Sequence, residues 1–262
     1  MRPNPLRDKL AAGDVALGGW LSLPSTASAE VMGGTGFDYV TVDMQHGMID
    51  YSDAVPMLQA IAIGSSTPLL RVPWKEPGII GKALDAGAMG VIVPMVNTAE
   101  ECEAVQRAGR YAPVGERSVG PVRALVAQGA EYLDRANESV SVIPMIETVT
   151  AVANLDEILS VDGVEVIYVG PSDLAVSLGL KPGSTDDRFH EALATIVAAC
   201  ERHGVVPGIH ATADLLADRT ARGFQMVTVS VDFATLRRGI ASDFATASQT
   251  AAEVSVGGST GE

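Results

Sequence analysis

The feature of this sequence that most limits its fold is the regular alternation of short apolar runs with helical patterns. A short apolar run flanked by Gly or Pro is typical of a strand buried on both faces in a parallel sheet. Runs of this kind recur about eight times, at residues 16–21, 37–43, 68–72, 90–95, 140–146, 166–169, 206–209 and 226–231. The alternation predicts one α/β domain, a parallel (β/α)8 TIM barrel over residues 1–250, rather than a doubly wound sheet.

The composition is compatible with one large core. Hydrophobic residues make up 47% of the 262 residues but aromatic residues only 5%, so Ala, Val, Leu and Ile must fill the interior. Residues 251–262 are dominated by Gly, Ser, Thr and Glu together with Ala and Val. We predict a disordered tail there, because such a terminus offers little to pack against a domain.

The charge and the cysteines limit the classes of partner and compartment. The net charge of −14, from 18 basic and 32 acidic residues, disfavours nucleic acid and anionic membranes as partners. Cys102 and Cys200 are the only cysteines, which gives neither a disulfide framework nor a zinc spacing. The sequence shows no apolar signal core and no membrane-spanning run, so we predict a cytoplasmic protein.

Polar residues follow several of the predicted strands at the end where a TIM barrel carries its active site. Asp43 and His46 follow the second strand, Arg71 ends the third, Glu147 ends the fifth and Asp173 follows the sixth. Each acid could simply cap the next helix, and for Asp173 alone that explanation is equally good. The five together favour a functional site.

The two later acids suggest a divalent metal ion. Glu147 and Asp173 offer two anionic oxygen ligands and leave room for water and substrate, as Mg²⁺ or Mn²⁺ requires. A 2-oxo acid could bind such a metal through its ketone and carboxylate, and the metal would then stabilise an enolate. Arg71 would add positive charge at the same oxygen, and the backbone N–H groups of Ser172 and Asp173 could hold the carboxylate. His46 is the candidate proton carrier, because imidazole titrates near neutral pH.

Two further residues leave alternatives open. His210 follows the seventh strand and either contacts substrate or packs as a polar residue. Asp85 ends the third helix, where a negative charge is unfavourable for the helix dipole. That position indicates either a specific partner for Asp85 or ordinary solvation.

Taken in order along the chain, these residues lie in motifs that resemble the class II pyruvate aldolases. These enzymes are the 4-hydroxy-2-oxo-acid aldolases of the hydroxyoxoheptanedioate and ketodeoxyglucarate type, in the HpcH/HpaI aldolase/citrate lyase family. The resemblance covers about residues 5–245, and its motifs are specific only as a set. They are Val42-Asp43-Met44-Gln45-His46-Gly47, Leu70-Arg71-Val72-Pro73, Leu84-Asp85-Ala86-Gly87, Arg110-Tyr111-Ala112-Pro113-Val114-Gly115-Glu116-Arg117, Ile146-Glu147-Thr148 and Gly170-Pro171-Ser172-Asp173-Leu174.

The resemblance implies a barrel of the phosphoenolpyruvate/pyruvate-domain type that assembles as a hexamer and requires Mg²⁺, Mn²⁺ or Co²⁺. It implies that His46 is the base, that Arg71 stabilises the transition state, and that Asp85 raises the basicity of His46 across a subunit contact. Glu147 and Asp173 would be the metal ligands, with the backbone of Ser172 and Asp173 on the substrate carboxylate. The substrates would be a small 2-oxo acid and an aldehyde.

The sequence departs from the family pattern at two places. Some relatives carry Gly-Glu where this chain has Met44-Gln45, and some carry Gln where it has Met145. Because Met cannot donate a hydrogen bond as Gln does, the substrate preference is expected to differ. Arg123 is a further candidate, for a distal carboxylate or hydroxyl of the aldehyde.

Three other functions compete with a metal-dependent aldolase. A Schiff-base aldolase needs a lysine at a strand end, and none of Lys9, Lys75, Lys82 and Lys181 ends a predicted strand, Lys75 being nearest. A citryl- or malyl-CoA-type lyase would need a basic surface for its long substrate, and the arginines of residues 109–123 are the only candidates for one. A non-catalytic metabolite-binding barrel would need none of the charged strand-end residues.

Overall fold

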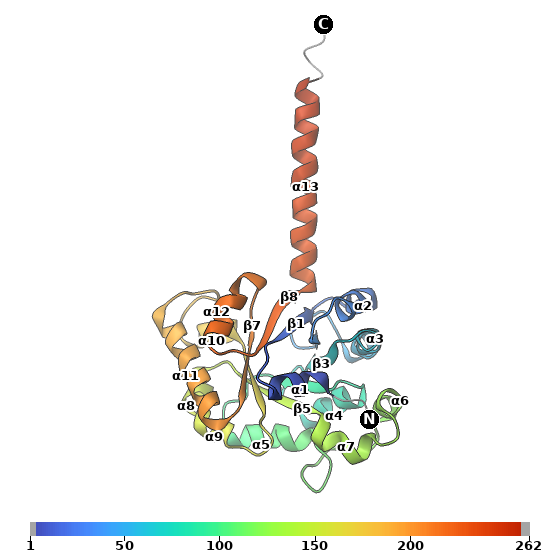
Figure 1. The fold of residues 1–262 in the computed structure, drawn as a ribbon, viewed down its shortest axis with the longest axis vertical. Helices are drawn as coiled ribbons and strands as arrows, with labels where there is room; N and C mark the ends of the chain where they lie inside the picture. The colour runs from blue at the N-terminus through green and yellow to red at the C-terminus, as the bar shows by residue number, and fades with distance from the viewer. Residues whose placement is uncertain (1–3, 258–262) are drawn as a thin grey trace.

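The computed structural model describes residues 4–257 and contains a closed barrel of eight parallel strands (Figure 1). Each strand pairs with the next along the chain, and the last pairs with the first. The predicted fold class is therefore confirmed, and every predicted strand overlaps an observed one. The strands are β1 (Ala16–Leu21), β2 (Tyr39–Asp43), β3 (Thr67–Arg71), β4 (Gly90–Val93), β5 (Ser141–Ile146), β6 (Val166–Val169), β7 (Val206–His210) and β8 (Met226–Val231).

Helices follow the strands and surround most of the barrel (Figure 1). Several begin at residues suited to capping: the hydroxyl of Ser25 accepts from the Ser28 N–H, and that of Thr98 from the Glu101 N–H, both at 3.2 Å. The helices are α1 (Pro5–Ala11), α2 (Thr26–Gly34), α3 (Tyr51–Ile61), α4 (Pro77–Asp85), α5 (Ala99–Ala108), α6 (Val122–Gln128), α7 (Tyr132–Ser139), α8 (Val149–Ala153), α9 (Leu155–Leu159), α10 (Pro171–Ser177), α11 (Asp187–His203), the 3₁₀ turn η1 (Ala213–Leu215), α12 (Leu216–Ala221) and α13 (Asp232–Gly257).

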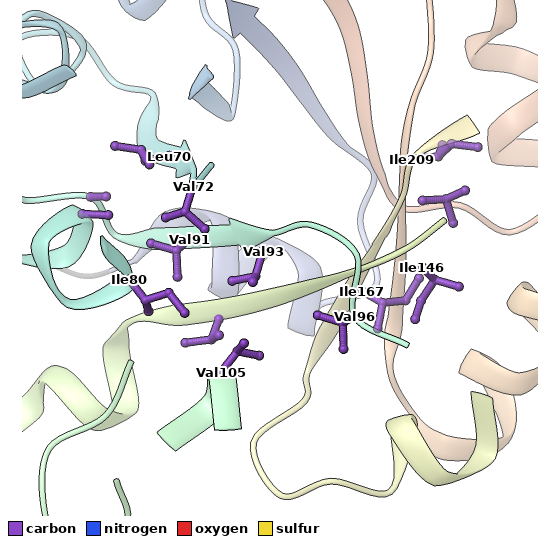
Figure 2. Close-up of a cluster of buried hydrophobic side chains, with 14 of the residues drawn as sticks. Leu70, Val72, Ile80, Val91, Val93, Val96, Val105, Ile146, Ile167 and Ile209 are labelled. Carbon is purple, nitrogen blue, oxygen red and sulfur yellow. The ribbon is translucent and has the colours of Figure 1, made fainter. Parts of the chain in front are cut away.

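The buried side chains form an outer and an inner layer. The outer layer lies between strands and helices and consists of branched aliphatic residues such as Val91, Ile146 and Ile167 (Figure 2). The inner layer fills the barrel with larger side chains and includes Leu6 and Leu10 of α1. Helix α1 therefore closes the N-terminal end of the barrel, which leaves the C-terminal end for the site.

Helix α13 differs from the other helices because it projects away from the barrel (Figure 1). Its first residue is anchored to the loop after β1, because the Asp232 carboxylate accepts hydrogen bonds from the N–H groups of Ser22 at 2.8 Å and Leu23 at 3.2 Å. Beyond Asp232, every residue through 252 is exposed. The helix continues through 251–257, where we predicted the start of a tail, and residues 258–262 lie outside the described residues.

None of the helices in residues 4–257 combines the length and apolar character needed to cross a bilayer.

Candidate active site

The C-terminal strand ends surround a cavity of about 170 Å³ that brings together most of the predicted site residues. His46, Arg71, Ser172, Asp173 and His210 all line it. Its other lining residues are Trp20, Met145, Tyr168, Gly170 and Pro171. The strands therefore gather groups from six separate parts of the chain, as the strand-end pattern predicts.

Arg71 and Asp43 form a buried ion pair because the register of β2 and β3 places them opposite one another. Arg71 Nε donates to Asp43 Oδ1 at 2.8 Å and Nη2 donates to Oδ2 at 2.6 Å. Burial alone would raise the pKa of Asp43, but the hydrogen bonds and charge of Arg71 outweigh it and hold that pKa below its usual value. The pair uses Nε and Nη2 of the guanidinium, so Nη1 is not committed to Asp43.

Trp20 contacts both members of this ion pair. The sequence did not predict this role. Its Nε1–H donates to Asp43 Oδ2 at 3.1 Å, and its ring lies 5.0 Å from the Arg71 guanidinium carbon. The same ring stacks on Tyr168 at 5.8 Å and meets His210 edge-on at 5.0 Å. The only sequence signal was its position at the end of the first predicted strand, where an aromatic residue is usually core.

Glu147 lies on the other side of the site in a different environment. Its side chain is 2% exposed, and its Oε1 accepts one hydrogen bond, from the Met95 N–H at 2.7 Å. Burial is the main cause that raises the pKa of Glu147 to about 7. The Met95 hydrogen bond and the Arg71 charge oppose it, and the negative charge of Asp173 adds to it. The protein itself therefore does not compensate this carboxylate.

Gly170 lies directly against the Glu147 carboxylate, just before the helical turn that carries Asp173. A Cβ atom at Gly170 would overlap Glu147 Oε2, so only glycine allows β6 to pass this close to the carboxylate. Asp173 itself is exposed and lies in the first turn of α10. The N–H groups of this turn, those of Ser172 and Asp173 among them, have no helical carbonyl to bind.

The two histidines of the cavity differ in environment. His46 is exposed, and its backbone N–H donates to Asp43 Oδ1 at 3.3 Å, which ties its loop to the ion pair. Burial, followed by the nearby Arg71 charge, lowers the pKa of His210 to about 4. His210 is therefore neutral near pH 7 and can exchange hydrogen bonds without carrying charge.

Two of the predicted site residues lie at the opposite end of the barrel. Asp85 ends α4 and accepts a 2.6 Å hydrogen bond from Arg117, whose side chain is 1% exposed. Arg123 donates to the Ala86 carbonyl and lines a cavity of about 280 Å³ together with Pro68 at the start of β3. Neither residue can reach the mouth of its own barrel.

The residues present suit a small divalent cation held by few protein ligands. Glu147 and Asp173 provide two adjacent carboxylates, and Glu147 Oε2 accepts no hydrogen bond from the described protein. Within residues 4–257, no three or more His, Cys, Asp and Glu side chains gather in a metal-binding cluster. Remaining ligands would have to come from substrate and water, which Mg²⁺ and Mn²⁺ accept.

A larger cavity of about 880 Å³ lies elsewhere, bordered by α5, α7 and residues 160–163. Its lining mixes Arg107 and Arg110 with Glu103, Asp134, Glu138 and Asp162. It lies away from the C-terminal strand ends, so size does not identify the active site here.

The model of the family described as HpcH/HpaI aldolase/citrate lyase matches residues 17–238. The chain belongs to this family. The predicted family is therefore confirmed, with a matched region that contains every site residue named above.

Several proteins with similar sequences are named as aldolases. A hydroxypyruvate/pyruvate aldolase of Rhizorhabdus wittichii is 42% identical over 240 residues, which covers 89% of this chain and 94% of the relative. A 4-hydroxy-2-oxo-heptane-1,7-dioate aldolase of Klebsiella pneumoniae is 37% identical over 240 residues, with 90% and 91% covered. A crystal structure of a family protein from Burkholderia cenocepacia is 32% identical and superimposes with a TM-score of 0.88, covering 93% of this chain and 99% of that one.

Proposed function

We propose that this HpcH/HpaI family member is a class II aldolase. It would reversibly cleave 4-hydroxy-2-oxo acids to pyruvate, or a related 2-oxo acid such as hydroxypyruvate, and an aldehyde. The observation that carries this proposal is the buried carboxylate of Glu147, which lies against Gly170 and interacts with the charge of Asp173. Gly170, Asp173 and Arg71 line the same cavity. The aldolase names of the similar proteins support the same reaction class.

Glu147 and Asp173 would hold Mg²⁺, Mn²⁺ or Co²⁺. When bound, the metal would supply a Lewis acid that stabilises negative charge on the substrate ketone oxygen. The uncommitted Nη1 of Arg71 would donate to that oxygen, and its fixed orientation by Asp43 means that little reorganisation is needed as charge develops. The first-turn N–H groups at Ser172 and Asp173 would bind the substrate carboxylate.

His46 would be the general base. In cleavage it would take the proton from the C4 hydroxyl, and the C3–C4 bond would break as the C4 carbonyl forms. The bonding electrons would move into the C2–C3 bond and onto the ketone oxygen, beside Arg71. Protonation at C3 would then release the 2-oxo acid, and the same steps in reverse would build the bond.

Asp85 can act on His46 only from a second copy, because it lies at the far end of its own barrel. Arg117 would hold the Asp85 carboxylate in a fixed position. Its guanidinium carbon lies 4.5 Å from the ring centroid of Tyr111 and 5.6 Å from that of Tyr132, so the two rings restrict it. A positioned carboxylate beside an imidazole raises its basicity.

Helix α13 supports a homo-oligomer, of which the hexamer implied by family resemblance is the proposed form. Phe233, Leu236, Ile240 and Phe244 are 46–74% exposed and recur at helical spacing, so they form one apolar stripe. A stripe of this length along a projecting helix is typical of a surface covered by a partner subunit. We also propose a cytoplasmic location, since Cys102 and Cys200 are buried thiols outside any disulfide.

The proposed function can be tested with a panel of 4-hydroxy-2-oxo acids, measuring pyruvate or hydroxypyruvate release. Activity should disappear in excess EDTA and return with Mn²⁺, Mg²⁺ or Co²⁺, added singly. Full activity in excess chelator would contradict the proposed metal. Turnover of citryl- or malyl-CoA with none of the panel cleaved would instead favour the CoA-lyase alternative.

The structure also weighs against a Schiff-base mechanism. Lys75, the nearest lysine, donates to the Met95 carbonyl at 3.0 Å and pairs with Glu101, so its ammonium group is already committed. Borohydride treatment with pyruvate should therefore give no covalent adduct.

A further inference from the structure

We propose that the Met95 peptide is a positioning device that makes Glu147 a one-oxygen metal ligand. In this role it would favour small octahedral dications such as Mn²⁺ and Mg²⁺ over Ca²⁺. The inference rests on the proposed metal site and adds to it a role for three residues outside the predicted set: Met95, Lys75 and Asn97.

The backbone of Met95 is unusual. Its φ is +58°, and among residues 4–257 it is the only residue other than glycine with a positive φ. A side chain with a Cβ atom is disfavoured in this left-handed region, and such residues persist where the surroundings over-determine them, often at functional sites. Met95 lies just beyond β4, beside Glu147 rather than in a remote turn.

The left-handed conformation gives the two oxygens of Glu147 different environments. Oε1 accepts the Met95 N–H at 2.7 Å. Oε2 faces Gly170, on the side of the loop that carries Asp173. The carboxylate therefore presents one oxygen to the proposed metal while the other is held by the backbone.

Several side chains hold the Met95 peptide in place. Its carbonyl accepts from Lys75 Nζ at 3.0 Å and from Asn97 Nδ2 at 3.1 Å. Glu101 in turn pairs with Lys75 and accepts the Asn97 N–H at 2.8 Å. Thr148, directly after Glu147, donates its hydroxyl to Asn97 Oδ1. The network thus connects both ends of the Met95–Glu147 contact.

A carboxylate restricted to one oxygen discriminates between cations. Ca²⁺ takes six to eight oxygen ligands and commonly binds a carboxylate through both oxygens, whereas Mg²⁺ requires a near-ideal octahedron of single oxygens. Loosening the Met95 peptide would free Oε1 and allow two-oxygen binding. The network should therefore raise affinity for the small ions and reduce the relative affinity for Ca²⁺.

The test is calorimetric titration of metal-free protein with Mn²⁺, Mg²⁺ and Ca²⁺, in Lys75→Met and Asn97→Ala variants. We expect Mn²⁺ and Mg²⁺ affinity to fall about tenfold, as for other groups that orient a ligand, with Ca²⁺ affinity unchanged or increased. Lys9→Met is the matched control. It removes a similarly exposed ion pair, with Asp38 at 2.8 Å, near the other end of the barrel and should bind all three ions like the unmodified protein.

A second pair of variants tests the backbone without depending on the side-chain network. Met95→Gly keeps the N–H and permits a positive φ, whereas Met95→Ala removes the same side chain and retains the strain. Met95→Gly should bind Mn²⁺ within about twofold of the unmodified protein and melt at a higher temperature than Met95→Ala. Equal melting temperatures would show that this backbone stores no strain.

The inference is overturned if Lys75→Met and Asn97→Ala bind all three ions as the unmodified protein does. Absence of any Mn²⁺ binding by the unmodified protein would remove the proposed metal site and the inference together. Normal metal binding without cleavage of any 4-hydroxy-2-oxo acid would contradict only the proposed reaction.

Discussion

Two buried carboxylates lie at the same end of this barrel, and their environments are opposite. Asp43 is compensated by a bidentate guanidinium and an indole N–H, and these hold its pKa below the usual value. Glu147 has one backbone hydrogen bond and lies near the Asp173 carboxylate, and burial is the main cause that raises its pKa to about 7. The difference is that the charge of Asp43 is compensated within the chain, whereas Glu147 forms no ion pair with a basic side chain among the described residues.

Removing the charge of Glu147 should produce the largest effect. Glu147→Gln keeps the size of the side chain and can still accept the Met95 N–H, but it loses an anionic ligand. Cleavage should fall about 10³-fold or more, because the Lewis acid supplies several kcal/mol of stabilisation. The metal-free variant should be at least as stable as the metal-free unmodified protein. If calorimetry showed the same metal affinity for both proteins, the contrast between Glu147 and Asp43 would be wrong.

Removing the charge of Asp43 should instead affect folding. Asp43→Asn leaves the Arg71 guanidinium buried without its counter-charge, which typically costs about 3–5 kcal/mol of stability. Urea unfolding would measure this loss, and Asp173→Asn, at an exposed position, is the control that should cost far less. If Asp43→Asn lowered the free energy of unfolding only slightly, the Asp43–Arg71 ion pair would not be a main source of stability at this end of the barrel.

The pH dependence of stability should report the burial of His210 beside the positive charge of Arg71. The pKa of His210 is about 4 in the folded protein and near the ordinary value of about 6.5 when unfolded, so the unfolded state binds more protons between these values. Stability should therefore fall as pH drops through this window, by about 1.4 kcal/mol per pH unit. His210→Gln should flatten this part of the unfolding profile, while His203→Gln, next to Asp156 on the surface, should not.

Trp20→Phe should give the smallest effect. It keeps an aromatic ring against Arg71 and removes the hydrogen bond to Asp43, which is worth about 1–3 kcal/mol when the acceptor is charged. We expect a correspondingly small loss in kcat, because Arg71 is then held less firmly. If Trp20 acts through Arg71, this loss in kcat should largely disappear when Trp20→Phe is made in an Arg71→Lys background. Equal losses in both backgrounds would indicate only a packing role.

The sequence predicted the barrel well because each strand carries a local signal. Apolar runs such as those of β5 and β6 are buried on both faces, and the motif residues after them are fixed to the mouth by the direction of the strands. The positions of Glu147, Asp173, Arg71 and His46 at the C-terminal strand ends were predictable for this reason, and their roles stay predictions.

Other parts of the site depend on register and backbone geometry, which leave little trace in one sequence. The contact between Trp20 and Asp43 depends on how β1 and β2 pair, and the role of Met95 depends on a φ value that its residue type disfavours. Arg123 was assigned to the mouth from its place in the chain, but the loop before α6 leads to the other end of the barrel. The extent of α13 was missed because its Ala- and Ser-rich end resembles a tail.

The projecting helix α13 has a thermodynamic consequence. A lone chain leaves most of its 26 residues to water, where an isolated helix is only marginally stable. If a second copy covers the apolar stripe, association contributes directly to the free energy of unfolding. The melting temperature should then climb with protein concentration, and on dilution α13 should fray while the barrel persists.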